Sequence, residues 1–189
     1  MMMHRGWAIR IMALAVLVWG GAVGGFQVQG QSSESATGDW ASLAVGGGFS
    51  GTHLEYGDHW VEGASAFVEA NFTWRYGIQG ETNWAFLNQR ENTHATTYLI
   101  GPRYQLAAFG NYRYRPYVKF LVGDGYFNFP LNYATGNYFV MAPGAGLDYW
   151  VSPRVRLRLF DFEYQYWPGF TFGSQTNPSV SVGIRYRIR

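Results

Sequence analysis

A short polar stretch in the first third of the chain contains residue types that could bind a metal ion. His53, Glu55, Asp58 and His59 lie within seven residues of one another, and imidazole and carboxylate groups are ligands that zinc accepts. A metal site requires several such side chains to converge on one point. The surrounding stretch 51–60 is rich in Gly and polar residues, which favours a solvent-exposed loop, so we predict no metal site here.

Asp161 and Glu163 are a second candidate, because two carboxylates at this spacing share one face of a β-strand and could form a general acid–base pair. Arginines fall on the same polar face, so we interpret the two carboxylates as ion-pair partners. The spacing of Ser, His and acidic residues indicates no catalytic triad. The glycines at 46–48 and 144–146 lack the strand-to-helix context of a phosphate-binding loop. The sequence therefore predicts no catalytic and no cofactor-binding residues.

The residues around these candidates follow a period of two rather than a helical period. Apolar and polar residues alternate in eight runs bounded by Gly, Pro, Asn or charged residues, which is typical of β-strands with one apolar face. These runs cover residues 41–46, 64–72, 78–86, 97–104, 116–123, 139–149, 155–166 and 179–188. With no linker and no solenoid repeat between them, they indicate one domain.

The seventh run changes phase within its length. Its apolar residues fall at odd positions up to Leu159 and at even positions from Phe162, which predicts a β-bulge near Phe160. The connections between runs also differ, and we expect the long ones at one end of the strands and the mostly shorter ones at the other. The long connections are 51–60, 87–95, 124–137 and 167–178.

The polar face carries charged residues in nearly every run. Five acidic and six basic residues alternate there with Gly and Ser, and a balanced set of charges suits the narrow interior of an eight-stranded barrel, where opposite charges can pair. The expected interior charge network consists of Glu69, Glu81, Arg103, Lys119, Asp148, Arg156, Arg158, Asp161, Glu163, Arg185 and Arg187.

Two further features favour a membrane barrel. Aromatic residues make up 19% of the chain and gather near the ends of the runs, where membrane barrels carry interfacial girdles. The last run can pair with the first, which would close the sheet and remove both of its edges. The pattern predicts an all-β fold, an eight-stranded antiparallel transmembrane up-and-down β-barrel.

The first thirty residues are typical of a secretory signal peptide. Arg5 and Arg10 precede or border the apolar stretch 11–18, and small residues follow it. This apolar stretch is well short of the roughly 20 residues that a membrane-spanning helix needs. Cleavage after Gly24 and cleavage after Gly30 both fit the sequence.

We therefore expect a cleaved signal peptide at 1–30, a flexible mature N-terminus at 31–38 and an outer-membrane barrel domain at 39–189. Of the 14 Lys and Arg residues, two lie in the leader, so 12 remain against 12 Asp and Glu. The mature chain is then formally neutral and lacks the basic surface that nucleic acid requires, so we expect no nucleic-acid partner. The chain has no Cys, which excludes disulfide and thiol chemistry.

Over about residues 39–189 the chain resembles the outer-membrane β-barrel family that includes the OmpA-like transmembrane domains and the opacity-type surface antigens. The phrases that carry the resemblance are GIQGETNW (77–84), YLIGPRYQL (98–106), RPYVKFLVG (115–123), APGAGLDYWVSPRVRLR (142–158) and NPSVSVGIRYRI (177–188). Members of this family share a scaffold rather than a reaction. Gly183, Tyr186 and Ile188 resemble the family's assembly signal, with Ile188 in place of the final aromatic residue.

Together these observations predict a non-enzymatic, exported protein of the Gram-negative cell outer membrane, with a structural or surface-interaction role through four extracellular loops. Its expected partners are outer-membrane lipid, the barrel-insertion machinery during biogenesis and an extracellular ligand of unknown chemistry. Two alternatives stay open. One is a lipid-modifying barrel enzyme or a carrier of small hydrophobic molecules, and the other is a soluble periplasmic β-barrel or β-sandwich with its apolar face inside.

Overall fold

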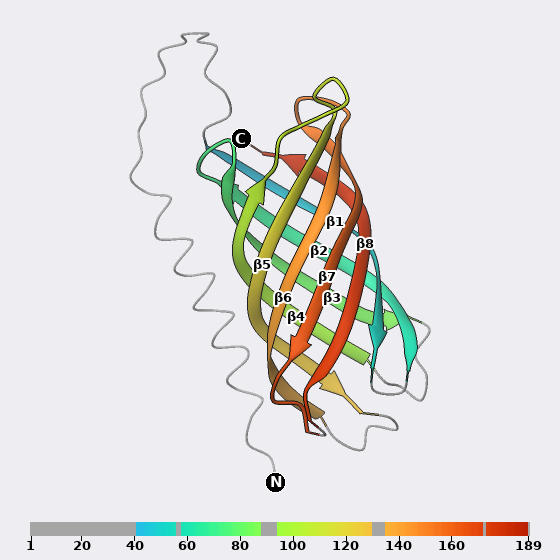
Figure 1. Ribbon diagram of the computed structural model, residues 1–189. Coiled ribbons are helices and arrows are strands. Elements are labelled where there is room, and N and C mark those ends of the chain that lie inside the picture. Colours follow the sequence, from blue (N-terminus) through green and yellow to red (C-terminus); the bar gives the residue numbers. More distant parts are fainter. Residues whose placement is uncertain (1–40, 56–57, 88–93, 130–134, 172, 189) are drawn as a thin grey trace. The chain divides into compact units, whose positions relative to one another are not determined.

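The computed structural model describes residues 41–55, 58–87, 94–129, 135–171 and 173–188. The predicted signal peptide and mature N-terminus lie outside these residues. The described chain forms a closed antiparallel barrel of eight strands, each paired with its neighbours in sequence (Figure 1). The strands are β1 (Ser42–Leu54), β2 (His59–Asn71), β3 (Tyr76–Leu87), β4 (His94–Gln105), β5 (Tyr114–Asn128), β6 (Thr135–Trp150), β7 (Val155–Trp167) and β8 (Gln175–Arg187). The predicted fold class is confirmed. No helix in the described part of the chain has the length and hydropathy that crossing a membrane requires.

The apolar face of the strands points outward and the charged face points inward. Near the middle of the strands, Ile100 is 56% exposed and Phe120 and Val182 are each 46% exposed, whereas Glu69 is fully buried and Arg158 is 2% exposed. Successive residues of a strand point to opposite sides of a sheet, so the alternation read from the sequence becomes an apolar exterior around a charged interior.

The predicted β-bulge near Phe160 is confirmed. The pairing of β7 with β8 shifts register between Arg158 and Asp161, and Leu159 and Phe160 both face outward, at 41% and 44% exposure. The extra residue lets Arg158 and Asp161, three positions apart, both point into the barrel.

The predicted pairing of the last strand with the first is also confirmed. β1 and β8 pair antiparallel from Ala44 with Arg187 to Thr52 with Ser179. Gly48 lies opposite Gly183 at the centre of this seam, and a Cβ atom at Gly48 would overlap the backbone around Val182. The two backbones approach closely here because neither glycine has a side chain.

The connections lie in two groups at opposite ends of the barrel (Figure 1). We call the end with the connections β1–β2, β3–β4, β5–β6 and β7–β8 the four-loop end, and the opposite end the three-turn end. The four connections predicted to be long do lie at one end, but the predicted difference in length is wrong. The connection after β1 spans only 55–58, and the longest of all, 106–113, lies at the three-turn end.

The strands extend further towards the four-loop end than the sequence predicted. At this end apolar side chains face inward and polar ones face outward, the reverse of the middle of the barrel, so the sequence pattern did not identify these residues as strand. Leu54 and Val61 point inward and are fully buried, whereas Glu62 points outward and is exposed. The interior of this end is filled by an apolar cluster, which the sequence analysis missed. Its members are Leu54, Val61, Ala85, Ala95, Leu99, Leu121, Phe127, Phe129, Val140, Ala142, Trp167 and Phe170.

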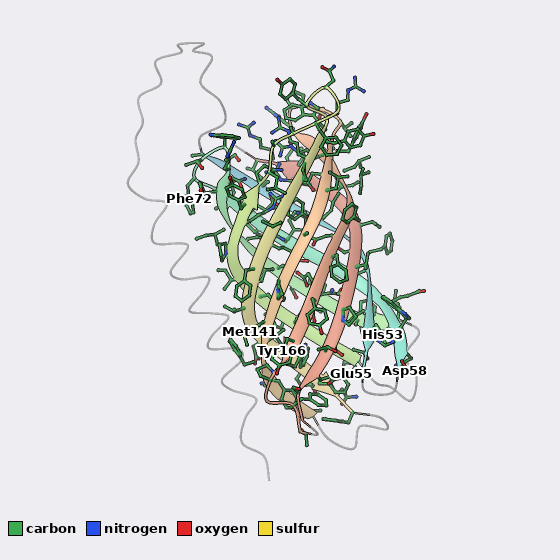
Figure 2. The ribbon with its side chains drawn as sticks, viewed as in Figure 1. His53, Glu55, Asp58, Phe72, Met141 and Tyr166 are labelled. Carbon is green, nitrogen blue, oxygen red and sulfur yellow. The ribbon has the colours of Figure 1, made fainter. Side chains whose placement is uncertain are left out.

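Side chains on the outside of the barrel also differ between the two ends. Figure 2 shows His53, Glu55 and Asp58 together at the four-loop end, and Phe72 at the three-turn end.

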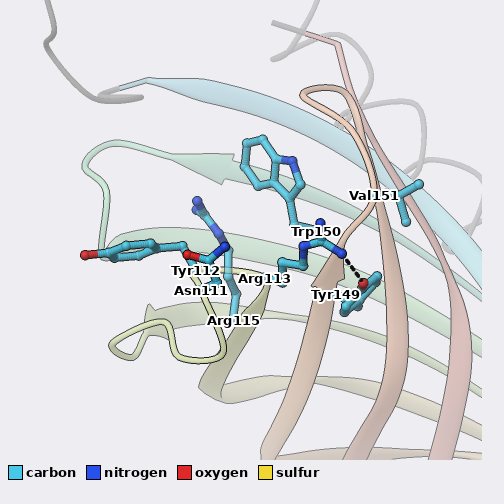
Figure 3. Close-up of a pocket in the computed structure, with 7 residues that line it drawn as sticks. All are labelled: Asn111, Tyr112, Arg113, Arg115, Tyr149, Trp150 and Val151. Carbon is cyan, nitrogen blue, oxygen red and sulfur yellow. Dashed lines mark hydrogen bonds between the residues drawn. The ribbon is translucent and has the colours of Figure 1, made fainter.

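A pocket lies at the three-turn end, beside the β4–β5 connection (Figure 3). Its volume is about 550 Å³. Its lining residues are Asn111, Tyr112, Arg113, Arg115, Tyr149, Trp150 and Val151.

Candidate functional site: a charge network in the barrel interior

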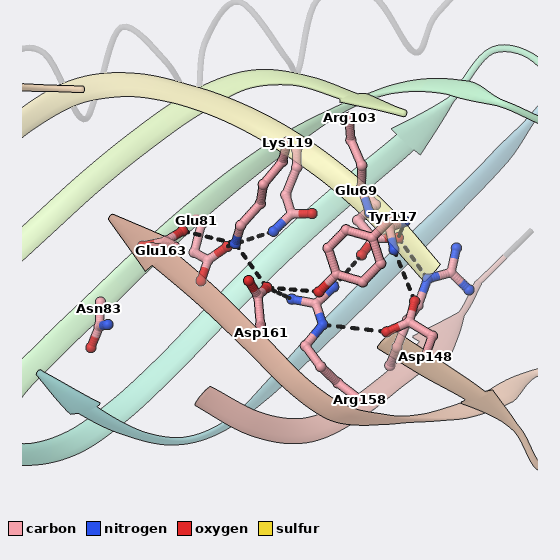
Figure 4. A network of polar contacts seen from close by, with 12 residues as sticks. Glu69, Glu81, Asn83, Arg103, Tyr117, Lys119, Asp148, Arg158, Asp161 and Glu163 are labelled. Atoms are coloured by element: carbon pink, nitrogen blue, oxygen red, sulfur yellow. Dashed lines mark hydrogen bonds and ion pairs between the residues drawn. The ribbon is translucent and has the colours of Figure 1, made fainter. Parts of the chain in front are cut away.

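Nine of the eleven charged residues expected in the interior form ion pairs with one another there (Figure 4). They come from seven strands, β2 to β8, and every one of their side chains is at most 3% exposed. The nine residues of this interior charge network are Glu69, Glu81, Arg103, Lys119, Asp148, Arg158, Asp161, Glu163 and Arg185.

One half of the network is centred on Glu69 of β2. Its carboxylate accepts hydrogen bonds from the guanidinium groups of Arg103 (2.8 Å), Arg158 (2.6 Å) and Arg185 (2.6 Å), which come from β4, β7 and β8. Asp148 accepts from Arg103 at 2.9 Å and lies 3.5 Å from Arg158. Two carboxylates therefore share three guanidinium groups, which are well suited to such contacts because each presents several N–H donors.

The other half is centred on Lys119 of β5. Its ammonium nitrogen lies 2.6 Å from Glu81, 2.7 Å from Asp161 and 2.8 Å from Glu163. Arg158 joins the two halves, since its Nη1 atom lies 3.0 Å from Asp161. One cation is thus placed among three carboxylates, and its ammonium group donates hydrogen bonds to two of them, Glu81 and Asp161.

Two interior aromatic residues support the network, and the sequence analysis missed both. The Tyr117 hydroxyl donates to Asp161 at 2.8 Å, and the Arg103 guanidinium lies 3.8 Å from the centre of the Tyr117 ring. The Arg158 guanidinium lies 3.6 Å from the centre of the Phe67 ring. Tyr117 and Phe67 are each two residues from a charged interior residue, so the period of two would have placed them inside.

β1 contributes no charged residue to the network. Its interior side chains instead form hydrogen bonds with neutral side chains of other strands. Ser50 donates to Asn83 at 2.7 Å, Asn83 donates to Ser179 at 2.8 Å, and Thr52 donates to Ser179 at 3.1 Å. These bonds tie β1 to β3 and β8 across the interior. Buried polar side chains with such partners avoid the cost of an unsatisfied group.

The other two residues expected in the interior lie outside the two halves of the network. Arg156 is buried, with its guanidinium 5.1 Å from the centre of the Trp150 ring. Arg187 is half-buried near the end of β8. Both belong to the three-turn end.

The geometry of Asp161 and Glu163 fits an ion pair rather than a general acid–base pair. Both carboxylates contact Lys119 and are at most 3% exposed, so neither is open to a substrate in this structure. The network can hold the opposite walls of the barrel together, as the contact between Glu69 of β2 and Arg158 of β7 illustrates.

The histidine-rich stretch is arranged differently from the loop that the sequence predicted. His53 lies in β1 and His59 in β2. His53 contacts Asp58 at 3.1 Å, while Glu55 is turned towards β8, where the backbone N–H and hydroxyl of Thr176 donate to it at 2.5 and 3.1 Å. Among the described residues, no group of three or more His, Cys, Asp or Glu side chains is placed to hold a metal ion.

The residues that resemble an assembly signal lie on the last strand and just beyond it. Gly183 lies at the seam opposite Gly48. The side chains of Tyr186 and Ile188 point outward, at 44% and 54% exposure. Recognition by the insertion machinery stays a prediction.

No protein-family model matches the chain, and no curated protein sequence matches it. Solved structures of outer-membrane barrels do match. Neisserial surface protein A matches with a TM-score of 0.56 and 14% identity, covering 78% of this chain and 97% of that chain. The outer membrane protein OprG from Pseudomonas aeruginosa matches with a TM-score of 0.55 and 10% identity, over 79% and 96%.

A third match is the attachment invasion locus protein Ail of Yersinia pestis, in complex with the heparin analogue sucrose octasulfate. Its TM-score is 0.53, with 14% identity, over 79% of this chain and all of that chain. At these identities the comparisons show a shared fold. The chain has the eight-stranded antiparallel barrel fold of these outer-membrane proteins.

Proposed function

We propose that the chain is a β-barrel protein of the bacterial outer membrane, with a structural or surface-interaction role rather than an enzymatic one. The observation that carries this proposal is that the barrel has a charged interior and an apolar exterior, the reverse of a soluble protein. Nine charged residues are buried in its interior, while Ile100, Phe120 and Val182 are exposed on its outside. An apolar exterior is stable in a bilayer, where the closed barrel leaves no backbone group unpaired at a sheet edge.

The fold of the matching solved structures supports the same proposal, since all three belong to surface or outer-membrane proteins. The filled interior favours a structural role over transport. An eight-stranded barrel encloses just enough room for side chains, and here the charge network and the apolar cluster occupy that room. Interaction with other molecules would then use the surface of the four-loop end.

The placement in a bilayer is tested with Phe120→Arg, which introduces a charge near the middle of β5 on the outer face. An arginine at the bilayer midplane costs about 2–4 kcal/mol in a membrane barrel, whereas a surface substitution in a soluble protein usually changes stability by about 0.5 kcal/mol or less. The control is Leu87→Arg at the end of β3, where the expected cost is about 0–1 kcal/mol.

The measurement is a urea titration of the barrel in lipid vesicles, read by the different gel mobility of folded and boiled protein. We expect Phe120→Arg to lower the unfolding free energy by several times the effect of Leu87→Arg. Equal and small effects, together with a protein that stays dissolved without detergent or lipid, would favour the soluble barrel.

A further inference from the structure

Charged residues outside the interior network separate by sign along the barrel. In the described part of the chain, the acidic ones all lie in the half towards the four-loop end, and the basic ones all lie at the three-turn end. The acidic residues are Glu55, Asp58, Glu62 and Asp124. The basic residues are Arg75, Arg113, Arg115, Arg154, Arg156 and Arg187. The three-turn end therefore has a strongly positive rim, which attracts anions.

Aromatic side chains hold several of these arginines in place. Arg113 donates a hydrogen bond to the Tyr149 hydroxyl at 3.2 Å. The guanidinium groups of Arg115 and Arg156 lie 4.6 and 5.1 Å from the centre of the Trp150 ring. A phenol or an indole ring orients a guanidinium group but does not cancel its positive charge.

Two of these arginines line the pocket beside the β4–β5 connection (Figure 3). Its volume of about 550 Å³ is within the range of sites that bind small molecules. Arg113 and Arg115 supply its positive charge, while Trp150 and Val151 supply aromatic and aliphatic surface. Val151 lies just beyond the end of β6 and is 53% exposed. The pocket thus combines anion-binding groups with an apolar wall.

The turn that forms one wall of the pocket has an unusual backbone. Gly110, Asn111 and Tyr112 have positive φ values of 60°, 57° and 63°, a region that a large side chain such as tyrosine seldom adopts. The Tyr112 side chain is 74% exposed, so packing within the described barrel does not explain why tyrosine occupies this position. Backbone strain of this kind is often found at binding sites, and Tyr112 lines the pocket.

We propose that this pocket binds the phosphate group of an anionic phospholipid headgroup at the three-turn end. The inference rests on the proposed insertion into a membrane. Arg113 and Arg115 donate to the phosphate oxygens, a geometry for which guanidinium groups are suited. Trp150 lies opposite the buried Arg156 in the sheet and so shares its interior face, where its ring holds Arg115 at the rim. The exposed Val151 contacts the glycerol and the start of the acyl chains.

The test places the purified full chain in nanodiscs of phosphatidylcholine that contain a minor fraction of phosphatidylglycerol. Native mass spectrometry then measures which lipids stay bound after release. We expect the unmodified protein to retain phosphatidylglycerol preferentially. The double variant Arg113→Gln with Arg115→Gln is expected to bind phosphatidylglycerol at least about tenfold more weakly. The loss of a single charge-assisted hydrogen bond can account for a change of this size.

The matched control is the double variant Arg75→Gln with Arg154→Gln, which removes the same number of charges at the same end but from residues that do not line the pocket. It should change retention much less than the double variant of Arg113 and Arg115. Tyr112→Gly relieves the strained turn and removes the ring, so it should weaken retention without loss of folding. Gel mobility of unboiled samples checks that every variant is folded.

Three results would overturn the inference. These are equal retention of both lipids by the unmodified protein, equal retention by the double variant of Arg113 and Arg115, and displacement of the lipid by soluble glycerol 1-phosphate, which would make a free phosphate ester the ligand. A barrel that inserts but shows no lipid preference contradicts only this inference. A chain that never inserts contradicts the proposed function instead.

Discussion

Lys119 is the residue whose removal should most disturb the barrel interior. Its nitrogen lies 2.6–2.8 Å from three carboxylates, and its side chain is fully buried. Lys119→Met keeps most of the side-chain volume but removes the charge. The network then holds five carboxylates and only three cations, Arg103, Arg158 and Arg185. Removing one partner of a buried ion pair costs about 3–5 kcal/mol, which lowers the folding equilibrium constant at least about a hundredfold.

The assay is equilibrium unfolding in urea with the protein in lipid vesicles, followed by gel mobility and tryptophan fluorescence. Arg154→Gln is the control, because Arg154 is exposed and lies outside the network. Its expected effect is about 0.5 kcal/mol or less. The comparison separates the loss of a buried cation from the loss of any positive charge.

A rescue variant tests whether the excess of carboxylates causes the loss of stability in Lys119→Met. Adding Glu81→Gln and Glu163→Gln to Lys119→Met leaves Glu69, Asp148 and Asp161 as the carboxylates of the network. Each of these still contacts an arginine, so we expect at least half of the lost stability to return. A stabilising role of Lys119 is refuted if Lys119→Met costs no more than Arg154→Gln, or if the rescue variant is no more stable than Lys119→Met alone.

Two further predictions concern the seam and the four-loop end. Gly48→Ala should destabilise the barrel by about 1–3 kcal/mol through overpacking, because its Cβ atom would meet the Val182 backbone. The same change at Gly80 meets no atom within 4 Å and should be nearly neutral, so equal thermal midpoints would contradict this account. Glu55→Ala removes both hydrogen bonds to Thr176 and should cost about 1–2 kcal/mol, with faster amide exchange at Thr176. Asp58→Ala, at a side chain that is 93% exposed, should leave that exchange rate unchanged.

The middle of the barrel could be predicted from the sequence because the alternation of outward and inward side chains holds there, apart from the bulge in β7. Outward-facing and interior-facing residues alternate along each strand, so a change of phase in the sequence has to be absorbed by a bulge in the backbone. The bulge near Phe160 follows from that rule, as do the inward directions of Arg158 and Asp161. Tyr117 obeys the same rule, since its position two residues before Lys119 predicts the buried, interior-facing side chain that the structure shows.

The two ends could not be predicted in this way, because the surroundings of the strands change there. At the four-loop end the outer face becomes polar and the interior becomes apolar, so Leu54 and Val61 are buried while Glu62 is exposed. The polar residues and glycines of the stretch 51–60 therefore have the composition of a loop, although most of this stretch is paired between β1 and β2. The pocket at the three-turn end depends on how Arg113 and Trp150 from separate elements meet, which no local pattern reveals.

The first strand shows how the network and the seam depend on each other. β1 contributes only small side chains to the interior at the level of the ion pairs, at Ala44 and Gly46, and their neighbours in the sheet come from β2 and β8. Because these residues are small, the Phe67 ring packs over Gly46, and Glu69 of β2 and Arg185 of β8 can meet above β1 at 2.6 Å. The pair therefore joins the strands on either side of the seam strand directly. A larger residue at Ala44 would separate Glu69 from Arg185 and weaken closure even where every backbone hydrogen bond of β1 is kept, since the ion pair adds a connection that the sheet alone does not provide.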